Sequence, residues 1–269
     1  MTMHRTRIIG VSGQLGSGKD TVAEHLIHEH GFARMALADP IKRFGYHVFL
    51  FTEQQLWGAS QYRNFEDPRY REGSKAWGAA EGRVVLLGLD FCRSLLGTDE
   101  VDDAYKALIH WFFWLRTEHP NLSPRVMLQA LGTEWGREAV HEDIWINALI
   151  AQARTLLHED GNTKEWEYDP LKGLTRQDKP RKAARGVVVS DVRFSNELAA
   201  IRAEGGSIIR VVRPATDSQA QETGIAGHAS EAQEFTMDKF DFLVQNEHSL
   251  KELYQSVDTF MSIFDVTHH

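Results

Sequence analysis

Residues 13–21, GQLGSGKDT, restrict the possible folds of this chain more than any other stretch. Gly13, Gly18 and Lys19 have the spacing G-x-x-x-x-G-K, in which backbone N–H groups surround a phosphate and the lysine reaches the outer phosphates. The apolar residues 8–11 before it are typical of a short buried strand, and apolar residues four apart after it indicate a helix. This order of strand, glycine loop and helix predicts a phosphate-binding loop (P-loop), a flexible glycine turn being the alternative.

Two further positions bear on the metal chemistry of such a loop. Asp20 stands where the motif usually has a Ser or Thr that contacts Mg²⁺. Thr21 follows one place later, so Thr21 is our candidate Mg²⁺ contact, directly or through water. A second candidate is Asp191, which ends the hydrophobic run GVVVSD, because P-loop enzymes use a strand-end aspartate near their Mg²⁺. Arg193 adds a cation beside it, although a local Asp–Arg pair would have the same pattern.

Composition argues against several other classes of protein. The 269 residues suffice for one α/β domain with insertions, or for two small domains. A formal net charge of −8 argues against a chain whose main task is to bind nucleic acid. A single cysteine, Cys92, excludes an internal disulfide framework and suits a reducing cytosol. The sequence shows no signal-peptide pattern and no apolar run of membrane-spanning length, so we expect a cytoplasmic protein without a membrane partner.

The final third of the chain alternates between strand and helix patterns. Residues 186–191, 207–214 and 240–246 are predicted strands, and residues 195–206 and 249–261 are predicted helices. This alternation predicts a parallel sheet with helices on both faces, where ligands bind at the carboxyl ends of the strands.

The middle of the chain is less regular. The many glycines of residues 58–98 predict bends rather than secondary structure. Residues 102–119 are predicted to form an aromatic-rich helix that suits a core or a homodimer face. Ser123 and Pro124 have the pattern of a helix start. In that helix Arg125 and Gln129 share a polar stripe, which would be an ordinary solvated face or a binding surface.

Several blocks in order along the chain carry a family resemblance. They are GQLGSGKDT, LADPIK, LQALGTEWGRE followed by DIW, SDVRFSNE, IIRVVRP, HASE and VQNEHSLKEL, and they extend from residue 8 to about residue 260. In this combination the chain resembles the bacteriophage deoxynucleoside monophosphate kinases. The resemblance implies an α/β three-layer P-loop kinase fold, with a central parallel sheet in a single domain over residues 1–269. It also implies an acceptor-binding arm at about 43–122 and a lid at about 214–238, and we interpret residues 158–185 as a surface insertion.

The same resemblance implies transfer of a phosphoryl group from ATP, with Mg²⁺, to a deoxynucleoside monophosphate in the host cytoplasm. The residues implied to bind ATP are Gly13, Gly16, Ser17, Gly18, Lys19, Asp20, Thr21, Arg213 and Asn246. Those implied to surround the acceptor are Lys42, Arg125, Gln129, Gly132, Thr133, Trp145, Asp191, Arg193 and Glu197. The implied catalytic residues are Lys19, Asp191 and Arg193, with Thr21 and Asp191 near the metal.

The predicted lid departs from the wider kinase pattern, because residues 214–238 contain no Arg or Lys. Arg213, Arg210 or Arg63 would then supply the missing cation, or the lid would close through His228. The sequence does not determine which base the acceptor nucleotide carries. Two rival functions also stay open: a different P-loop small-molecule kinase, such as a dephospho-coenzyme A kinase, and a nucleotide-switched ATPase acting on a protein partner.

Overall fold

The computed structural model describes residues 7–14, 16–59, 61–158, 161–169, 173–181, 184–213 and 239–267. The chain divides into two compact units. The sheet unit comprises Met1–Leu37, Leu149–Asn162 and Pro180–His269, and the helical unit comprises Ala38–Ala148 and Thr163–Lys179. The predicted lid, together with His228, lies outside the described residues. The organisation as one kinase domain with an arm stays a prediction.

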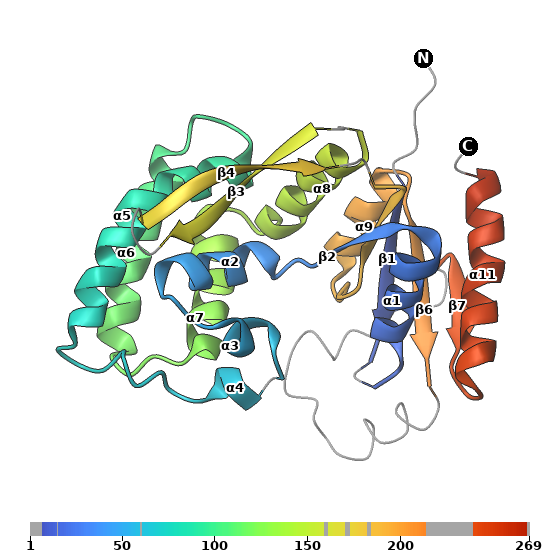
Figure 1. Ribbon diagram of the computed structural model, residues 1–269, viewed down its shortest axis with the longest axis horizontal. Coiled ribbons are helices and arrows are strands. Elements are labelled where there is room, and N and C mark those ends of the chain that lie inside the picture. Colours follow the sequence, from blue (N-terminus) through green and yellow to red (C-terminus); the bar gives the residue numbers. More distant parts are fainter. Residues whose placement is uncertain are drawn as a thin grey trace. The chain divides into compact units, whose positions relative to one another are not determined.

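The sheet unit is built on five strands that all run parallel, which confirms the predicted fold class. Their order is β2-β5-β1-β6-β7. Figure 1 labels β2, β1, β6 and β7 in this order. The strands are β1 (Ile8–Gly13), β2 (Phe32–Met35), β5 (Gly186–Val189), β6 (Ser207–Val212) and β7 (Phe242–Gln245). The helices that pack on them are α1 (Lys19–His30), α9 (Ser195–Ala203) and α11 (Leu250–Thr267).

Both faces of this sheet are covered, which explains why its strands are apolar along most of their length. On one face Val11 of β1 belongs to an apolar cluster with Leu26 of α1 and Val257 of α11. On the other face, a Cβ added at Gly10 would lie 3.0 Å from the side chain of Ile201 in α9. The sheet unit therefore has three layers, with α1 and α11 on one side and α9 on the other.

The strand order reverses at β1, and this reversal positions the candidate site. The chain passes from β1 through α1 to β2 on one side, whereas β5 and β6 lie on opposite sides of β1. In open parallel sheets, ligands bind outside the carboxyl ends of the strands at such a switch point. The glycine loop follows directly after the carboxyl end of β1.

The helical unit is packed around aromatic side chains. Its helices are α2 (Asp39–Val48), α3 (Glu53–Trp57), α4 (Gln61–Asn64), α5 (Lys75–Leu96), α6 (Asp102–Glu118), α7 (Pro124–Ala130), the π-helix η1 (Leu131–Val140) and the start of α8 (Ile144–His158). The Phe49 ring lies within 6.2 Å of the rings of Tyr70, Trp77 and Phe112, measured between ring centroids. Aromatic pairs in such edge-to-face and tilted arrangements stabilise a core beyond their buried area.

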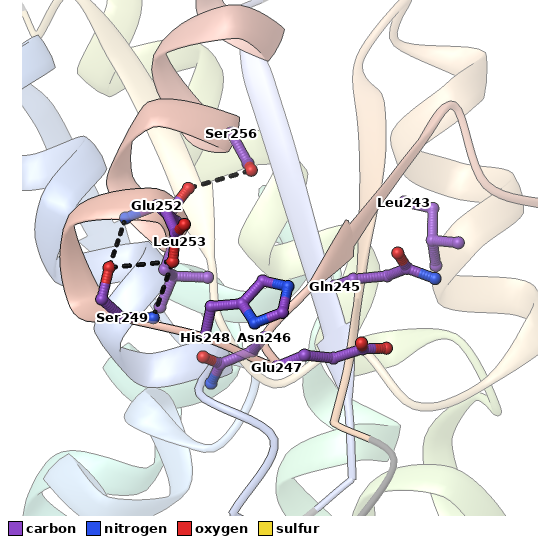
Figure 2. A pocket seen from close by; sticks show the side chains of 9 residues that line it. All are labelled: Leu243, Gln245, Asn246, Glu247, His248, Ser249, Glu252, Leu253 and Ser256. Atoms are coloured by element: carbon purple, nitrogen blue, oxygen red, sulfur yellow. Dashed lines mark hydrogen bonds between the residues drawn. The ribbon is translucent and has the colours of Figure 1, made fainter.

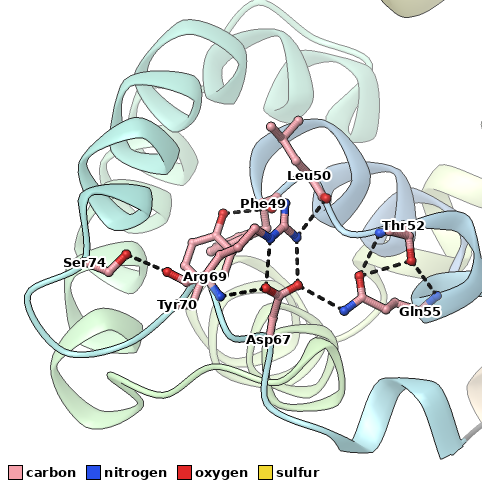
Figure 3. A network of polar contacts seen from close by, with 8 residues as sticks. All are labelled: Phe49, Leu50, Thr52, Gln55, Asp67, Arg69, Tyr70 and Ser74. Carbon is pink, nitrogen blue, oxygen red and sulfur yellow. Dashed lines mark hydrogen bonds and ion pairs between the residues drawn. The ribbon is translucent and has the colours of Figure 1, made fainter.

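One buried carboxylate organises the loop between α4 and α5. Asp67 accepts hydrogen bonds from Arg69 Nε and Nη2 at 2.8 and 2.7 Å and from Gln55 Nε2 at 3.0 Å (Figure 3). The Tyr70 hydroxyl donates to the carbonyl of Phe49 at 2.8 Å. A buried charge is tolerated only when it is paired and hydrogen-bonded, and Asp67 meets that condition.

The irregular structure predicted for residues 58–98 is wrong. Most of that segment is α5, a helix of 22 residues that begins at the cap residue Ser74. Glycine in a helix costs about 0.5–1 kcal/mol relative to alanine. That cost is offset because α5 buries an apolar stripe that includes Trp77, Val84 and Leu95. Gly88 also allows the ring of Tyr105 to approach the helix closely.

Other segments also differ from the sequence pattern. The helix start at Ser123 and Pro124 is confirmed, because the Ser123 hydroxyl accepts from the Val126 N–H. Gly132, a residue that would end a typical helix, lies inside η1. The predicted insertion contains a two-stranded sheet, β3 (Gly161–Asp169) with β4 (Gly173–Arg181). Among the described residues, no helix combines the length and apolar character needed to cross a bilayer.

Candidate nucleotide-binding site

The loop between β1 and α1 has the backbone geometry that its glycines predict. Gly16 and Gly18 have φ angles of 80° and 97°, in the left-handed region that favours glycine. Gly18 is the N-cap of α1, so the first N–H groups of that helix open onto the loop. The buried Ser17 hydroxyl has no hydrogen-bond partner among the described residues. This loop offers unpaired donors and a helix N-terminus to an anion.

A pocket of about 420 Å³ lies beside this loop. It is lined by seven of the residues predicted to bind ATP, namely Gly16, Gly18, Lys19, Asp20, Thr21, Arg213 and Asn246, together with His248, Leu250 and Leu253. Gly13 and Ser17 are not among the lining residues, and Ser17 is buried behind them. Arg213 and Asn246 are more than 190 positions from the loop in sequence, and the fold brings them to the same pocket.

The junction of β7 and α11 is tied to the loop by Asn246. The side-chain Nδ2 of Asn246 donates to the backbone carbonyl of Ser17 at 2.8 Å. This contact fixes the distance between the loop and the start of α11. A capping box opens α11: the Ser249 N–H donates to Glu252 Oε2 at 2.9 Å, and the Glu252 N–H donates to the Ser249 hydroxyl at 3.3 Å.

A second pocket, of about 360 Å³, adjoins the first and shares Asn246, His248 and Leu253 with it. Figure 2 shows its lining side chains around the end of β7 and the first turns of α11. Its remaining lining residues are Leu243, Gln245, Glu247, Ser249, Glu252 and Ser256. The sequence reasoning singled out only Asn246 here, because a strand-to-helix junction carries no distinctive motif.

Lys19 and Asp20 belong to a series of ion pairs and hydrogen bonds that the sequence did not predict. Lys19 Nζ lies 2.9 Å from Asp20 Oδ2, and Arg34 Nη2 lies 3.2 Å from Asp20 Oδ1. The same Arg34 nitrogen lies 3.2 Å from the hydroxyl of Ser190. Arg34 therefore connects the start of α1 to the carboxyl end of β5, next to Asp191. A single Arg in a four-residue strand gave no sequence signal for this role.

The loop after β5 carries Asp191, Arg193 and Glu197. Asp191 Oδ1 accepts from the backbone N–H of Leu37 at 3.4 Å. The buried Glu197 accepts from the backbone N–H groups of Arg193 and Phe194 at 2.7 and 3.0 Å. Glu197 thus holds the backbone of this loop in place, while the side chain of Arg193 is exposed to solvent.

The remaining predicted acceptor residues lie in the helical unit. Gln129 and Thr133 are exposed and Arg125 is half-buried, as the polar stripe predicts. Lys42 is half-buried on α2, which packs against α7. The buried Trp145 donates its indole N–H to the carbonyl of Gly132 at 2.8 Å. Since this is the only polar group of the indole, Trp145 has no hydrogen bond left to offer a ligand.

A pair of arginines marks a cationic spot next to this stripe. Arg125 Nε donates to Asn64 Oδ1 at 2.5 Å, and Arg63 Nη2 donates to the carbonyl of Gly58 at 2.9 Å. Burial and the neighbouring Arg125 guanidinium lower the pKa of Arg63 below its usual value. Neither guanidinium has a carboxylate partner within the described part of the chain, and the buried Arg63 Nε has no partner there at all. Two like charges without a counter-ion favour an anionic ligand.

The fold and the loop define this chain as a P-loop protein. No protein-family model matches it. It is 24% identical over 260 residues to a mimivirus (Acanthamoeba polyphaga mimivirus) protein named as a deoxynucleotide monophosphate kinase, with 93% of each chain covered. It is 23% identical to the deoxynucleotide monophosphate kinase of Enterobacteria phage T4, covering 96% of this chain and 99% of the relative. The deoxynucleoside-5'-monophosphate kinase of Escherichia phage T5 is 26% identical over 217 residues, which is 71% of this chain and 69% of the relative.

Two solved structures also align over nearly the whole chain. One is TT1252 from Thermus thermophilus, at 14% identity and a TM-score of 0.37, covering 96% of this chain and 98% of that one. The other is a dephospho-CoA kinase from Campylobacter jejuni, at 15% identity and a TM-score of 0.35, covering 97% and 98%. The similarity to the viral kinases confirms the resemblance noted in the sequence.

Proposed function

We propose that this protein is an ATP-dependent deoxynucleoside monophosphate kinase. It transfers the γ-phosphoryl group of ATP to the phosphate of a deoxynucleoside monophosphate, giving ADP and a deoxynucleoside diphosphate. The observation that carries the proposal is the pocket beside the P-loop, which gathers Lys19, Thr21, Arg213 and Asn246. Similarity to three viral kinases with this name, which covers 93%, 71% and 96% of this chain, supports the choice of acceptor.

The donor half of the site lies in the sheet unit. ATP phosphates would lie in the loop against the N-terminus of α1, with Lys19 and Arg213 as cations. The adenine would occupy the adjoining pocket at the β7–α11 junction, where Gln245 and His248 supply polar edges. Phosphoryl transfer needs positioned cations more than a reactive side chain, because the acceptor's own phosphate oxygen attacks.

A metal fits the donor half. The Thr21 hydroxyl and the Asp20 carboxylate line the pocket beside the loop, and Asp191 follows β5, the strand that pairs with β1. Mg²⁺ prefers such oxygen ligands together with phosphate. Thr21 and Asp191 would hold Mg²⁺, directly or through water. When bound, the ion neutralises charge on the donor phosphates. Lys19 and Arg34 hold Asp20 from two sides, so Asp20 is the less available carboxylate.

The acceptor half relies on the cationic pair of the helical unit. Arg63 and Arg125 would bind the phosphate of the monophosphate, since they form a pair of like charges without a carboxylate partner among the described residues, next to the polar stripe. Arg63 is also one of the residues that would replace the lid arginines. Gln129, Thr133 and Lys42 would complete the acceptor surface, and Asp191 and Arg193 would act at the reacting phosphates. The protein would act in the cytoplasm of the infected host.

A coupled assay that follows ADP release tests this function. ATP is offered with each deoxy- and ribonucleoside monophosphate in turn, and with dephospho-coenzyme A. We expect turnover with at least one deoxynucleoside monophosphate, and near-background turnover for Lys19→Ala with its fold intact. ADP release that required a protein partner and gave no phosphorylated small product would contradict the proposal.

A second set of variants tests the acceptor half. Arg125→Ala and Arg63→Ala each remove a charge-assisted contact to the acceptor phosphate. Each substitution should lower kcat/KM for the acceptor by about 10–100-fold, which corresponds to about 1.5–3 kcal/mol. The affinity for ATP should not change. Arg116→Ala is the matched control, because Arg116 pairs with Glu81 at the surface of the same unit. Equal kinetics for Arg125→Ala and the control would refute this assignment.

A further inference from the structure

Two histidines of α1 and one aspartate of α11 converge at a second place in the sheet unit. His25 Nε2 lies 2.7 Å and His30 Nε2 lies 2.9 Å from the same oxygen of Asp258. The three potential ligand atoms all lie within 4.8 Å of one another. None of these residues lines either pocket, so the cluster is separate from the proposed nucleotide site.

The surroundings of the cluster hold His25 in place but leave Asp258 largely exposed. The His25 side chain is only 8% exposed, and its ring stacks on Tyr254 with a centroid distance of 4.1 Å and an interplanar angle of 8°. The Asp258 side chain is 51% exposed and His30 is 17% exposed. A buried imidazole, a second imidazole and an exposed carboxylate form a typical set of protein ligands for a metal.

We propose that His25, His30 and Asp258 form a binding site for a transition-metal ion of the Zn²⁺ class. Imidazole nitrogen with carboxylate oxygen suits Zn²⁺, whereas Mg²⁺ prefers oxygen alone. Zinc bonds of about 2.0–2.1 Å in tetrahedral geometry place neighbouring ligand atoms roughly 3.3 Å apart. The present nitrogen–oxygen separations are therefore short by about half an ångström, which a rotation of the exposed carboxylate supplies. Water would take the fourth position.

The position of the cluster gives the ion a structural role. α1 begins in the P-loop, and α11 follows the Asn246 junction. A metal bound at His25, His30 and Asp258 would cross-link these two helices away from their pocket-lining ends. Metal that binds only the folded state stabilises it by RT ln(1 + [M]/Kd), where [M] is the free metal concentration.

Titration calorimetry with ZnCl₂ tests the site, together with the visible absorption of added Co²⁺ on the nucleotide-free protein. The chain has 13 histidines, so the comparison between variants decides, not total binding. His30→Gln keeps a side-chain donor for Asp258 but removes the imidazole, and Asp258→Asn keeps the shape but removes the charge. His28→Ala is the matched control, because His28 is exposed on the same helix.

We expect one Zn²⁺ site in the unmodified protein and in His28→Ala. Loss of a direct ligand should weaken that site by at least about tenfold in His30→Gln and Asp258→Asn, as outer contacts alone are worth 10–100-fold. Zn²⁺ should also raise the thermal unfolding midpoint of the unmodified protein, and at the same Zn²⁺ concentration this rise should be smaller in both variants. Unchanged Zn²⁺ affinity in His30→Gln and Asp258→Asn would overturn the proposal. The three residues would then serve only to hydrogen-bond α1 to α11.

Discussion

Replacing Gly18 by alanine tests the geometry of the loop most directly. The φ angle of Gly18 is 97°, and an alanine there costs about 1–2 kcal/mol for a left-handed backbone. Its Cβ would also lie 2.4 Å from Asn246 Nδ2, so the amide must move. Moving it removes the hydrogen bond to the Ser17 carbonyl, worth about 1 kcal/mol net. We therefore expect the free energy of unfolding of the sheet unit to fall by roughly 2–3 kcal/mol.

The matched control lies at the other end of the same helix. Gly31 has a φ angle of 70°, but the nearest atom to an added Cβ is 3.8 Å away, at Arg185. Gly31→Ala should therefore cost only the backbone strain, about 1–2 kcal/mol. Denaturant unfolding of both variants measures the difference, and ATP titration should show weakened binding for Gly18→Ala alone.

A double-mutant cycle isolates the contact itself. Asn246→Ala alone removes the same hydrogen bond, so adding it to Gly18→Ala should cost less than the sum of the two single changes. We expect a coupling of about 1 kcal/mol, within the range for residues in contact. If Gly18→Ala costs no more than Gly31→Ala and the cycle is additive, the Asn246 amide does not lie against the loop, and our reasoning fails.

Two further substitutions and one labelling experiment test the helical unit. Gly136→Ala should destabilise it by about 1–3 kcal/mol in denaturant unfolding, because the new Cβ would lie 2.4 Å from the Trp145 ring. Burial would raise the pKa of Asp67, but hydrogen bonds from Arg69 outweigh it and lower the pKa below 3.8. The stabilisation by Asp67 is therefore complete above about pH 4 and is lost as the pH falls through the lower folded-state value. Asp67→Asn should make the free energy of unfolding less dependent on acid pH, and an unchanged slope would contradict this. Burial raises the pKa of Cys92 to about 12, so a disulfide reagent at about pH 8 should label this thiol only after denaturation.

Local patterns were enough to predict much of the sheet unit. The glycine spacing and the apolar strand before it identified the loop, and alternating strands and helices gave the parallel sheet. The aromatic-rich helix at residues 102–119 is also confirmed, as α6. These elements are encoded by contiguous residues, so a reading along the chain finds them.

Features that depend on tertiary packing were not predictable in this way. The glycines of α5 indicated bends, but burial of Trp77 and its neighbours outweighs their helix cost. Arg34 gained its place between Asp20 and Ser190 only when β2 and β5 paired. The division into two units likewise rests on contacts between distant segments.

The 2.9 Å contact of Lys19 with Asp20 has a consequence for turnover. An incoming phosphate must compete with a carboxylate that already holds this lysine, and Arg34 keeps the carboxylate nearby. The free energy needed to separate Lys19 from Asp20 offsets part of the attraction between Lys19 and the phosphate. When a bound nucleotide leaves the loop, Asp20 can pair with Lys19 again, so Lys19 is not left without a counter-ion. In the kinase that we propose, this exchange would lower the affinity for the nucleotide and speed the release of ADP.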